Sequence, residues 1–195
     1  MTIISALESV HIKGLFGDHE GKNEKNLLNI SENKNLLIIQ IVQYKNSTVS
    51  IGNIKIDNLN LHNQTLNVTS NNDTRILWNG PNCWLLVSSK KELLGEIIKK
   101  FDEMNFAITN LSHSRAIIEL TGENVKEVLK KGCPYDFNSL KKNNCLNSTF
   151  NGMSVTIDFL DDNPNKIRIF TLRSFGESLY QSITDSCLEF GYKSI

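Results

Sequence analysis

Residues 75–104 read RILWNGPNCWLLVSSKKELLGEIIKKFDEM, and this stretch decides the predicted fold. The apolar runs RILW and WLLV flank an Asn-Gly-Pro-Asn turn, which predicts a β-hairpin over 75–87. Ser89 and Glu92 have the spacing of a capping box, so a helix should follow. Apolar side chains then recur at helical spacing and predict one buried stripe over 90–104, formed by Leu93, Leu94, Ile97, Ile98, Phe101 and Met104.

Working outward from this unit, the remaining periodic segments predict an α+β fold. Short apolar or alternating runs predict strands at 36–42, 49–56, 106–111, 115–120, 153–160 and 166–172. A short helix should open at Thr121 and end at Gly132, and a last helix should end near Phe190. From about residue 84 the order is β-α-β-β-α-β-β-α, which indicates a mixed or antiparallel sheet with packed helices.

The predicted domain organisation is simple. Residues 1–35 are weakly patterned and are interpreted as an N-terminal arm, extended or irregular, and residues 36–195 as one α+β domain. A chain of 195 residues is long enough to bury a hydrophobic core without disulfides or metals.

Charge and composition exclude some function classes. Lys and Arg together number 21, as do Asp and Glu, so the net charge is zero. A nucleic-acid-binding protein would normally be basic, and a polybasic membrane anchor would too, so neither kind of partner is expected. The chain has 25 Asn, 21 Ile and 17 Lys but only four Arg, which is typical of a bacterial-like genome of low GC content.

The sequence also favours a cytoplasmic protein. It shows no secretory signal and no apolar run of membrane-spanning length. The four cysteines are widely spaced and form no CxxC pair, so we expect reduced thiols.

No pattern specific to catalysis, cofactor binding or metal binding is present. The sequence has no Walker loop, GxGxxG, GxSxG or HExxH, and its four histidines are scattered. Cys133 follows a predicted helix end, where the negative end of the helix dipole should not lower its pKa. Asp161 and Asp162 are adjacent in a turn-like segment, which indicates a solvated loop. We therefore expect no catalytic, cofactor-binding or metal-binding residues in this chain.

Four segments together resemble one family. They lie in register over roughly residues 77–190, and they read LWNGPNCWLLV (77–87), NLSHSRAIIELTG (110–122), LKKGCPYDF (129–137) and TLRSFGESL (171–179). Their order and spacing are similar to the γ subunit of heterotetrameric sarcosine oxidase. That family resembles the folate-binding domain of the aminomethyltransferase, or glycine-cleavage T-protein, and the resemblance implies the same fold here.

The resemblance also implies partners and a function. The γ subunit belongs to an oxidoreductase complex that oxidatively demethylates sarcosine, in sarcosine catabolism and folate-linked one-carbon metabolism. In that complex the large α subunit carries NAD and a folate-binding region, the β subunit carries FAD and FMN, and the small δ subunit binds zinc. The γ subunit binds none of these cofactors and packs against the α subunit, which implies a non-catalytic role for this chain.

The residues themselves suggest where a partner subunit would bind. Two segments lie at the ends of predicted elements, where backbone leaves the core, and Arg115 and Tyr135 are typical interface anchors. The candidate interface is Ser112, His113, Ser114 and Arg115 together with Cys133, Pro134, Tyr135 and Asp136. The alternative is that these residues only join the strand–helix units within the fold.

Other functions remain open on the sequence. A similar subunit occurs in the N-methylglutamate dehydrogenase complex, so the methylated substrate is not fixed. A free-standing folate-binding one-carbon protein is a second alternative, because the resembled fold hosts that chemistry. A third is an accessory module whose partner is unrelated to flavoenzymes.

Overall fold

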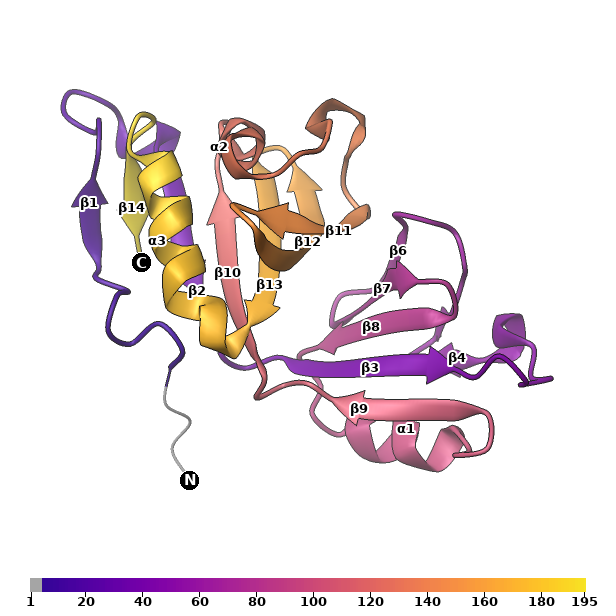
Figure 1. Cartoon of the computed structure of the whole chain (residues 1–195). Coiled ribbons are helices and arrows are strands. Elements are labelled where there is room, and N and C mark those ends of the chain that lie inside the picture. Colours follow the sequence, from indigo (N-terminus) through magenta and orange to yellow (C-terminus); the bar gives the residue numbers. More distant parts are fainter. Residues whose placement is uncertain (1–4) are drawn as a thin grey trace. The chain divides into compact units, whose positions relative to one another are not determined.

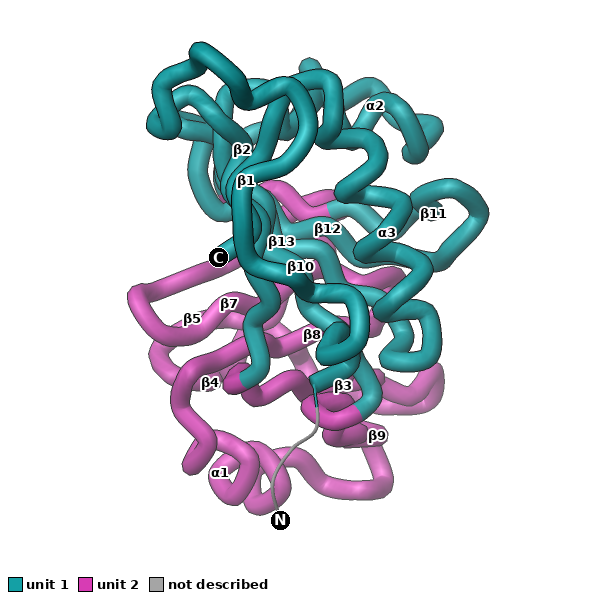
Figure 2. The backbone as a smooth tube through the Cα atoms, turned by 90° about the vertical axis from the view of Figure 1, so that its left-hand side faces the viewer, with its two compact units in different colours: residues 1–34, 114–142, 146–195 teal, residues 35–113, 143–145 magenta. Residues whose placement is uncertain are grey.

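A computed structural model describes residues 5–195, which form two compact units. Unit 1 contains residues 1–34, 114–142 and 146–195, of which residues 5 onward are described, and unit 2 contains residues 35–113 and 143–145 (Figure 2). Each unit has its own sheet and its own helices (Figure 1). The α+β fold predicted from the sequence is confirmed.

Unit 1 is built on a seven-stranded mixed sheet with the strand order β1-β14-β2-β10-β13-β12-β11. The pairs for which the register is known are antiparallel, except that β14 and β2 run parallel. The strands are β1 (Gly14–Phe16), β2 (Leu28–Glu32), β10 (Arg115–Thr121), β11 (Cys145–Phe150), β12 (Met153–Asp162), β13 (Asn165–Leu172) and β14 (Tyr192–Ser194).

Two helices, α2 (Val125–Gly132) and α3 (Gly176–Cys187), pack on this sheet. A Cβ atom built on Gly176 would lie 3.0 Å from the Cβ of Ala116, so α3 approaches β10 closely at its first turn. Ala116, Ile118 and Leu120 alternate along β10 and are buried, as expected for the strand face beneath a helix. The core of unit 1 therefore lies between this face and the two helices.

Unit 2 contains a five-stranded sheet with the order β6-β7-β8-β3-β9 and a separate two-stranded hairpin. Its strands are β3 (Leu37–Gln43), β4 (Lys55–Ile56), β5 (Leu59–Asn60), β6 (Val68–Ser70), β7 (Thr74–Gly80), β8 (Cys83–Ser88) and β9 (Phe106–Asn110). The helix α1 (Leu93–Lys100) contributes Leu93 and Ile97 to a buried cluster that includes Ile39, Ile41 and Trp84.

The predicted 75–87 hairpin is confirmed, with Trp78 opposite Trp84 in the β7–β8 register. The helix predicted over 90–104 is shorter in the structure, and fewer of its apolar side chains are buried than the sequence predicted. Ile98 is 60% exposed and Met104 is 89% exposed. The capping box is wrong, because the Ser89 hydroxyl donates to Asp73 and α1 begins only at Leu93.

The prediction of an irregular N-terminal arm over 1–35 is wrong for two segments. Gly14–Phe16 is strand β1 and Leu28–Glu32 is strand β2, both inside the unit 1 sheet. Unit 2 begins at Asn35. A single domain over 36–195 stays a prediction, while the compact units divide that range.

Three further differences concern strands. The predicted strand at 49–56 is mostly a 3₁₀ turn at Ile51–Asn53 followed by the two-residue β4. The sequence pattern also missed β11 and the terminal β14. The predicted order therefore gains one strand before β12 and one after α3.

None of the helices formed by residues 5–195 is long and apolar enough to cross a membrane.

Candidate subunit interface

The segment Ser112–Arg115 carries the first half of the candidate interface, and part of it has an internal role. The Ser112 hydroxyl oxygen accepts a hydrogen bond from the Ile38 backbone N–H at 3.0 Å and donates to the Asn110 side chain at 2.7 Å. It thus joins the start of β3 to the end of β9. His113 and Ser114 are exposed. Ser112 therefore fits a structural use, whereas His113 is free to meet solvent or a partner.

Arg115 stands at the first position of β10 with a half-buried side chain. Its guanidinium makes one long hydrogen bond, 3.4 Å to the Ser114 carbonyl, and no carboxylate of residues 5–195 pairs with it. Burial lowers the pKa of Arg115, although a guanidinium still carries its charge near neutral pH. A partly desolvated cation with unused donors is well suited to a carboxylate on another chain.

One exposed apolar side chain lies opposite Arg115 and a second lies in the turn after β13, and the sequence analysis predicted neither. Leu172 is directly opposite Arg115 in the β10–β13 register and is 41% exposed. Phe175, in the 3₁₀ turn that follows β13, is 40% exposed. Strand alternation does not account for this exposure, because Leu172 shares its face with the buried Phe170 as well as with Arg168. Arg115, Leu172 and Phe175 are called the strand-end patch below.

The second half of the candidate interface follows α2. Cys133 is only 4% exposed, and its thiol donates to the Ser148 hydroxyl. Burial raises the pKa of Cys133, which agrees with the expectation that its position at a helix end does not lower that pKa. The Asp136 carboxylate accepts from the Asn138 N–H and caps a 3₁₀ turn. The Tyr135 ring packs edge-on against Phe137, so Pro134 and Asp136 are the exposed members.

The structure does not bring the two halves together. Arg115 pairs with Leu172 at one end of β13, whereas Phe137 packs near Phe159, which pairs with Ile167. Ile167 and Leu172 are five residues apart, which corresponds to roughly 17 Å along a strand. Ser112 and His113 belong to unit 2, and the remaining candidate residues lie at two separate spots on unit 1. Of these two spots, only the strand-end patch combines a donor-rich cation with exposed apolar groups.

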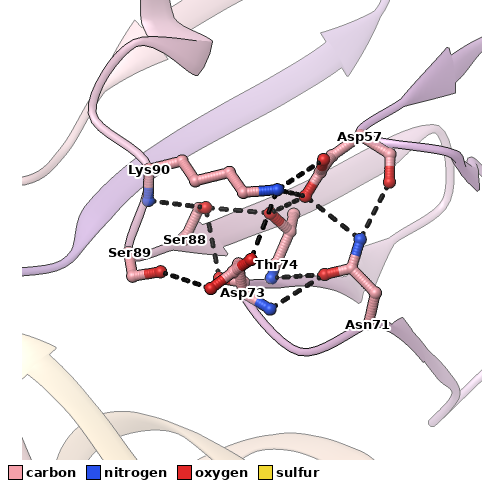
Figure 3. Close-up of polar contacts among 7 residues, drawn as sticks. All are labelled: Asp57, Asn71, Asp73, Thr74, Ser88, Ser89 and Lys90. Carbon is pink, nitrogen blue, oxygen red and sulfur yellow. Dashed lines mark hydrogen bonds and ion pairs between the residues drawn. The ribbon is translucent and has the colours of Figure 1, made fainter.

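A polar cluster in unit 2 has the residue types of a catalytic site (Figure 3). The Thr74 hydroxyl donates to Asp57 at 2.6 Å and lies 2.8 Å from the buried Ser88 hydroxyl. The Lys90 ammonium contacts Asp57 and Asp73, and these contacts raise its pKa. A protonated ammonium cannot take a proton from Ser88 or Thr74. The cluster therefore holds neighbouring loops together, and it does not pair a nucleophile with a general base.

A second charged cluster lies on one face of the unit 1 sheet. The Arg168 guanidinium donates twice to one oxygen of Glu119, at 2.9 and 2.7 Å. Lys166 and Asn33 also contact this carboxylate. Burial alone would raise the pKa of Glu119, but the Arg168 charge and hydrogen bonds hold it below its ordinary value. Both oxygens of Glu119 are occupied, so the cluster stabilises the sheet.

Within residues 5–195 the cysteines and the possible metal ligands form no reactive or metal centre. No disulfide joins the four cysteines, all of which lie among the described residues, and Cys83 is the one that is not buried. Burial raises the pKa of Cys187 to about 12. Within residues 5–195 no three His, Cys, Asp or Glu side chains are grouped as metal ligands would be.

A family model described as "Sarcosine oxidase, gamma subunit family" matches residues 54–189. A chain of the heterotetrameric sarcosine oxidase from Corynebacterium sp. U-96, solved with pyrrole 2-carboxylate, is 19% identical with a TM-score of 0.80. The alignment covers 96% of this chain and 95% of that chain.

A more distant likeness agrees with the predicted fold. The glycine cleavage system aminomethyltransferase T from Bartonella henselae is 12% identical with a TM-score of 0.58, over 82% of this chain and 46% of that chain. At these identities both structures show the fold alone. No curated protein matches the chain.

Proposed function

Because the chain belongs to the sarcosine oxidase gamma subunit family, we propose that it is a structural subunit of a multi-subunit, flavin-dependent oxidase that demethylates sarcosine. The family match confirms the resemblance predicted from the sequence. In this proposal the chain is not the catalyst. It stabilises the assembly by burying surface against the larger subunits.

One observation carries the proposal. The family match spans 136 residues (54 to 189) of the 195, and the fold corresponds end to end with a single chain of a heterotetrameric enzyme. A chain that aligns over its whole length with one subunit fits a place in such an assembly. We propose the α, β and δ subunits of the same complex as its partners, with direct packing against α.

The strand-end patch supports a role in assembly. Stable subunit contacts centre on aromatic and Arg anchors within an apolar surround. Arg115 supplies unused guanidinium donors, and Leu172 and Phe175 supply exposed apolar area next to it. Pro134, Tyr135 and Asp136 offer a second contact.

In this proposal FAD, FMN, NAD, folate and zinc are bound by the partner subunits. The fold family makes folate the one group to consider for this chain. A pterin ring is held best by a buried carboxylate that accepts from its ring N–H groups. A cavity of about 300 Å³ in unit 1 is lined by Ser9, Val10, Ile12, Phe16, Tyr180, Gln181, Thr184 and Tyr192, which do not fit that need.

The test is assembly with the neighbouring subunits. A tagged chain is co-expressed with the α, β and δ subunits and purified on its tag. The proposal predicts one complex that oxidises sarcosine in preference to N-methylglutamate. A chain that purifies alone would overturn the proposed function, and a preference for N-methylglutamate would reassign the substrate.

Variants locate the contact. Arg115→Ala with Phe175→Ser should weaken co-purification, because the double change removes the cation and the aromatic anchor. Tyr135→Ala tests the second spot. Lys91→Ala, an exposed change in unit 2, is the control. If the double variant melts like wild type and assembles fully, the strand-end patch is not the interface.

A further inference from the structure

Strand β9 lies at the outer edge of the five-stranded sheet in unit 2, and among the strands of residues 5–195 it pairs only with β3 (Figure 1). The hydrogen-bond pattern between β9 and β3 follows from two backbone bonds, one at each end of this strand pair. The Tyr44 N–H donates to Asn105, and the Leu111 N–H donates to Ile38. Antiparallel pairs alternate between bonded and non-bonded positions. Ala107 and Thr109 therefore bond to β3, while Phe106, Ile108 and Asn110 turn their backbone groups outward.

One of these outward-facing backbone groups already has a hydrogen-bond partner. The Phe106 N–H donates to the Asp102 carbonyl at the end of α1. The N–H and C=O groups of Ile108 and Asn110 remain at the open edge. Natural proteins usually protect an edge strand with a charge, a proline or a bulge. Phe106–Asn110 reads FAITN and has no charged residue and no proline, and its register with β3 is continuous.

A groove lined mostly by apolar residues runs along the same edge. Its volume is about 560 Å³, and it is lined by Tyr44, Ile98, Phe101, Glu103, Phe106, Ala107 and Ile108. Ala107 and Ile108 point to opposite faces of the strand, so the groove follows the edge itself. Ile98 is 60% exposed and Tyr44 is 44% exposed, and Met104 extends from the adjacent loop with 89% of its surface exposed.

The charge in the groove limits what fits there. Glu103 is its only charged lining residue, and its exposed carboxylate pairs with no cation of residues 5–195. We propose that β9 and this groove bind an extended apolar segment of another subunit by β-strand addition, with a Lys or Arg of that segment meeting Glu103. The inference rests on the proposed function, because it assigns a contact within that complex.

A second copy of the chain fits this site less well. Pairing of two β9 strands would bring FAITN against FAITN, and that strand itself carries no basic side chain, so Glu103 would meet a cation only from residues outside the strand. A strand from a different subunit can supply both the backbone groups and the cation. Strand addition draws affinity from backbone hydrogen bonds and specificity from alternate side chains, which suits a free edge beside an apolar groove.

The direct test is hydrogen exchange, resolved to single amides, on the isolated chain and on the purified complex. The amides of Ile108 and Asn110 should exchange at least about tenfold more slowly in the complex, because each gains a hydrogen-bond partner or loses contact with water. The amides of Ala107 and Thr109, already bonded to β3, should change little. An assembled complex with unchanged exchange at Ile108 and Asn110 overturns the inference.

Variants give a second measure. Ile108→Pro removes an outward N–H that β3 does not use and should weaken co-purification about tenfold. Ile108→Ala loses comparable packing but keeps the N–H, so it is the matched control. Glu103→Lys should also weaken assembly, whereas Glu123→Lys, an exposed change in unit 1, should not. Equal assembly by Ile108→Pro and Glu103→Lys overturns the inference, even if one of them is less stable.

The remaining outcomes separate the two proposals. If the wild-type chain joins no complex, the proposed function and this inference fail together. If the complex forms and the groove variants are neutral, only the inference fails. If the isolated chain is a dimer whose Ile108 amide is already slowed, the occupant is a second copy and the inference is overturned.

Discussion

The ammonium of Lys90 lies 2.8 and 3.0 Å from the two carboxylate oxygens of Asp57 (Figure 3). Asp57 and Asn58 form the two-residue turn between β4 and β5, and both have positive φ, as a tight hairpin of this kind requires. Lys90 follows β8. The pair therefore fastens the small hairpin to the end of the five-stranded sheet within unit 2.

This contact predicts an acid-dependent stability. Hydrogen bonds from Lys90, Thr74 and Asn71 lower the pKa of Asp57 from 3.8 to about 2. A carboxyl group with a lowered folded-state pKa contributes stability that is present above its unfolded-state pKa and lost as pH falls. Asp57→Asn should lower the melting temperature by a few degrees at pH 7, since charge-assisted hydrogen bonds are lost. The difference from wild type should shrink as pH falls from about 4 toward 2.

Thermal melts of both proteins across this pH range check the prediction. Lys22→Ala is the control, because Lys22 forms an exposed ion pair with Asp18 that should contribute little. A constant difference between Asp57→Asn and wild type from pH 7 to pH 2 would mean that the carboxylate charge does not hold the hairpin.

Neighbouring residues of α1 give a matched pair for the core. Ile97 is 1% exposed and Ile98 is 60% exposed on the same helix. Ile97→Asp buries an unpaired charge, which costs several kcal/mol and should abolish soluble folding. Ile98→Asp should leave a folded, soluble chain. Soluble expression and melting curves of the two variants test this difference. Similar curves for both would contradict the packing of α1.

Two glycines predict opposite effects of the same substitution. A Cβ on Gly132, at the end of α2, would lie 2.7 Å from the ring of the buried Phe150. Gly132→Ala should destabilise by about 1–3 kcal/mol through overpacking. Gly95, inside α1, has open space at its Cβ position, so Gly95→Ala should stabilise by about 0.5–1 kcal/mol. Denaturant unfolding measures both, and a neutral Gly132→Ala would contradict the contact.

Cofactor content is a further expected outcome. The isolated chain should show no flavin absorbance and no stoichiometric zinc, because we assign these groups to partner subunits. Absorption spectra and metal analysis of the purified chain, with the assembled complex as the positive control, test this. A yellow isolated chain that retains flavin would contradict the assignment.

The sequence predicted those strands and turns whose characteristic pattern of apolar and turn residues lies within the element itself. The β7–β8 hairpin has turn residues between two apolar runs, β12 alternates over residues 153–160, and β13 is rich in apolar residues, so all were found. The strands β2 and β14 were missed for a physical reason. Their neighbours in the sheet lie far away in the sequence, and three-residue β14 is too short to show a period.

The candidate site was harder to predict than the fold. Sequence position suggested Arg115, and the structure shows its unused donors. The sequence also placed Cys133 in the candidate interface, although the packing of α2 against β11 leaves this thiol only 4% exposed. Helical spacing also placed Ile98 in the stripe, although the groove at β9 leaves it exposed.

The central claim is that this chain stabilises an oxidase without performing its chemistry. The most direct measurement compares sarcosine oxidation by the α, β and δ subunits expressed with and without this chain, at equal flavin content. The account predicts that activity without the chain is low or decays quickly on warming, that adding the purified chain restores it, and that the chain alone has none. Equal and equally durable activity without the chain would contradict the account.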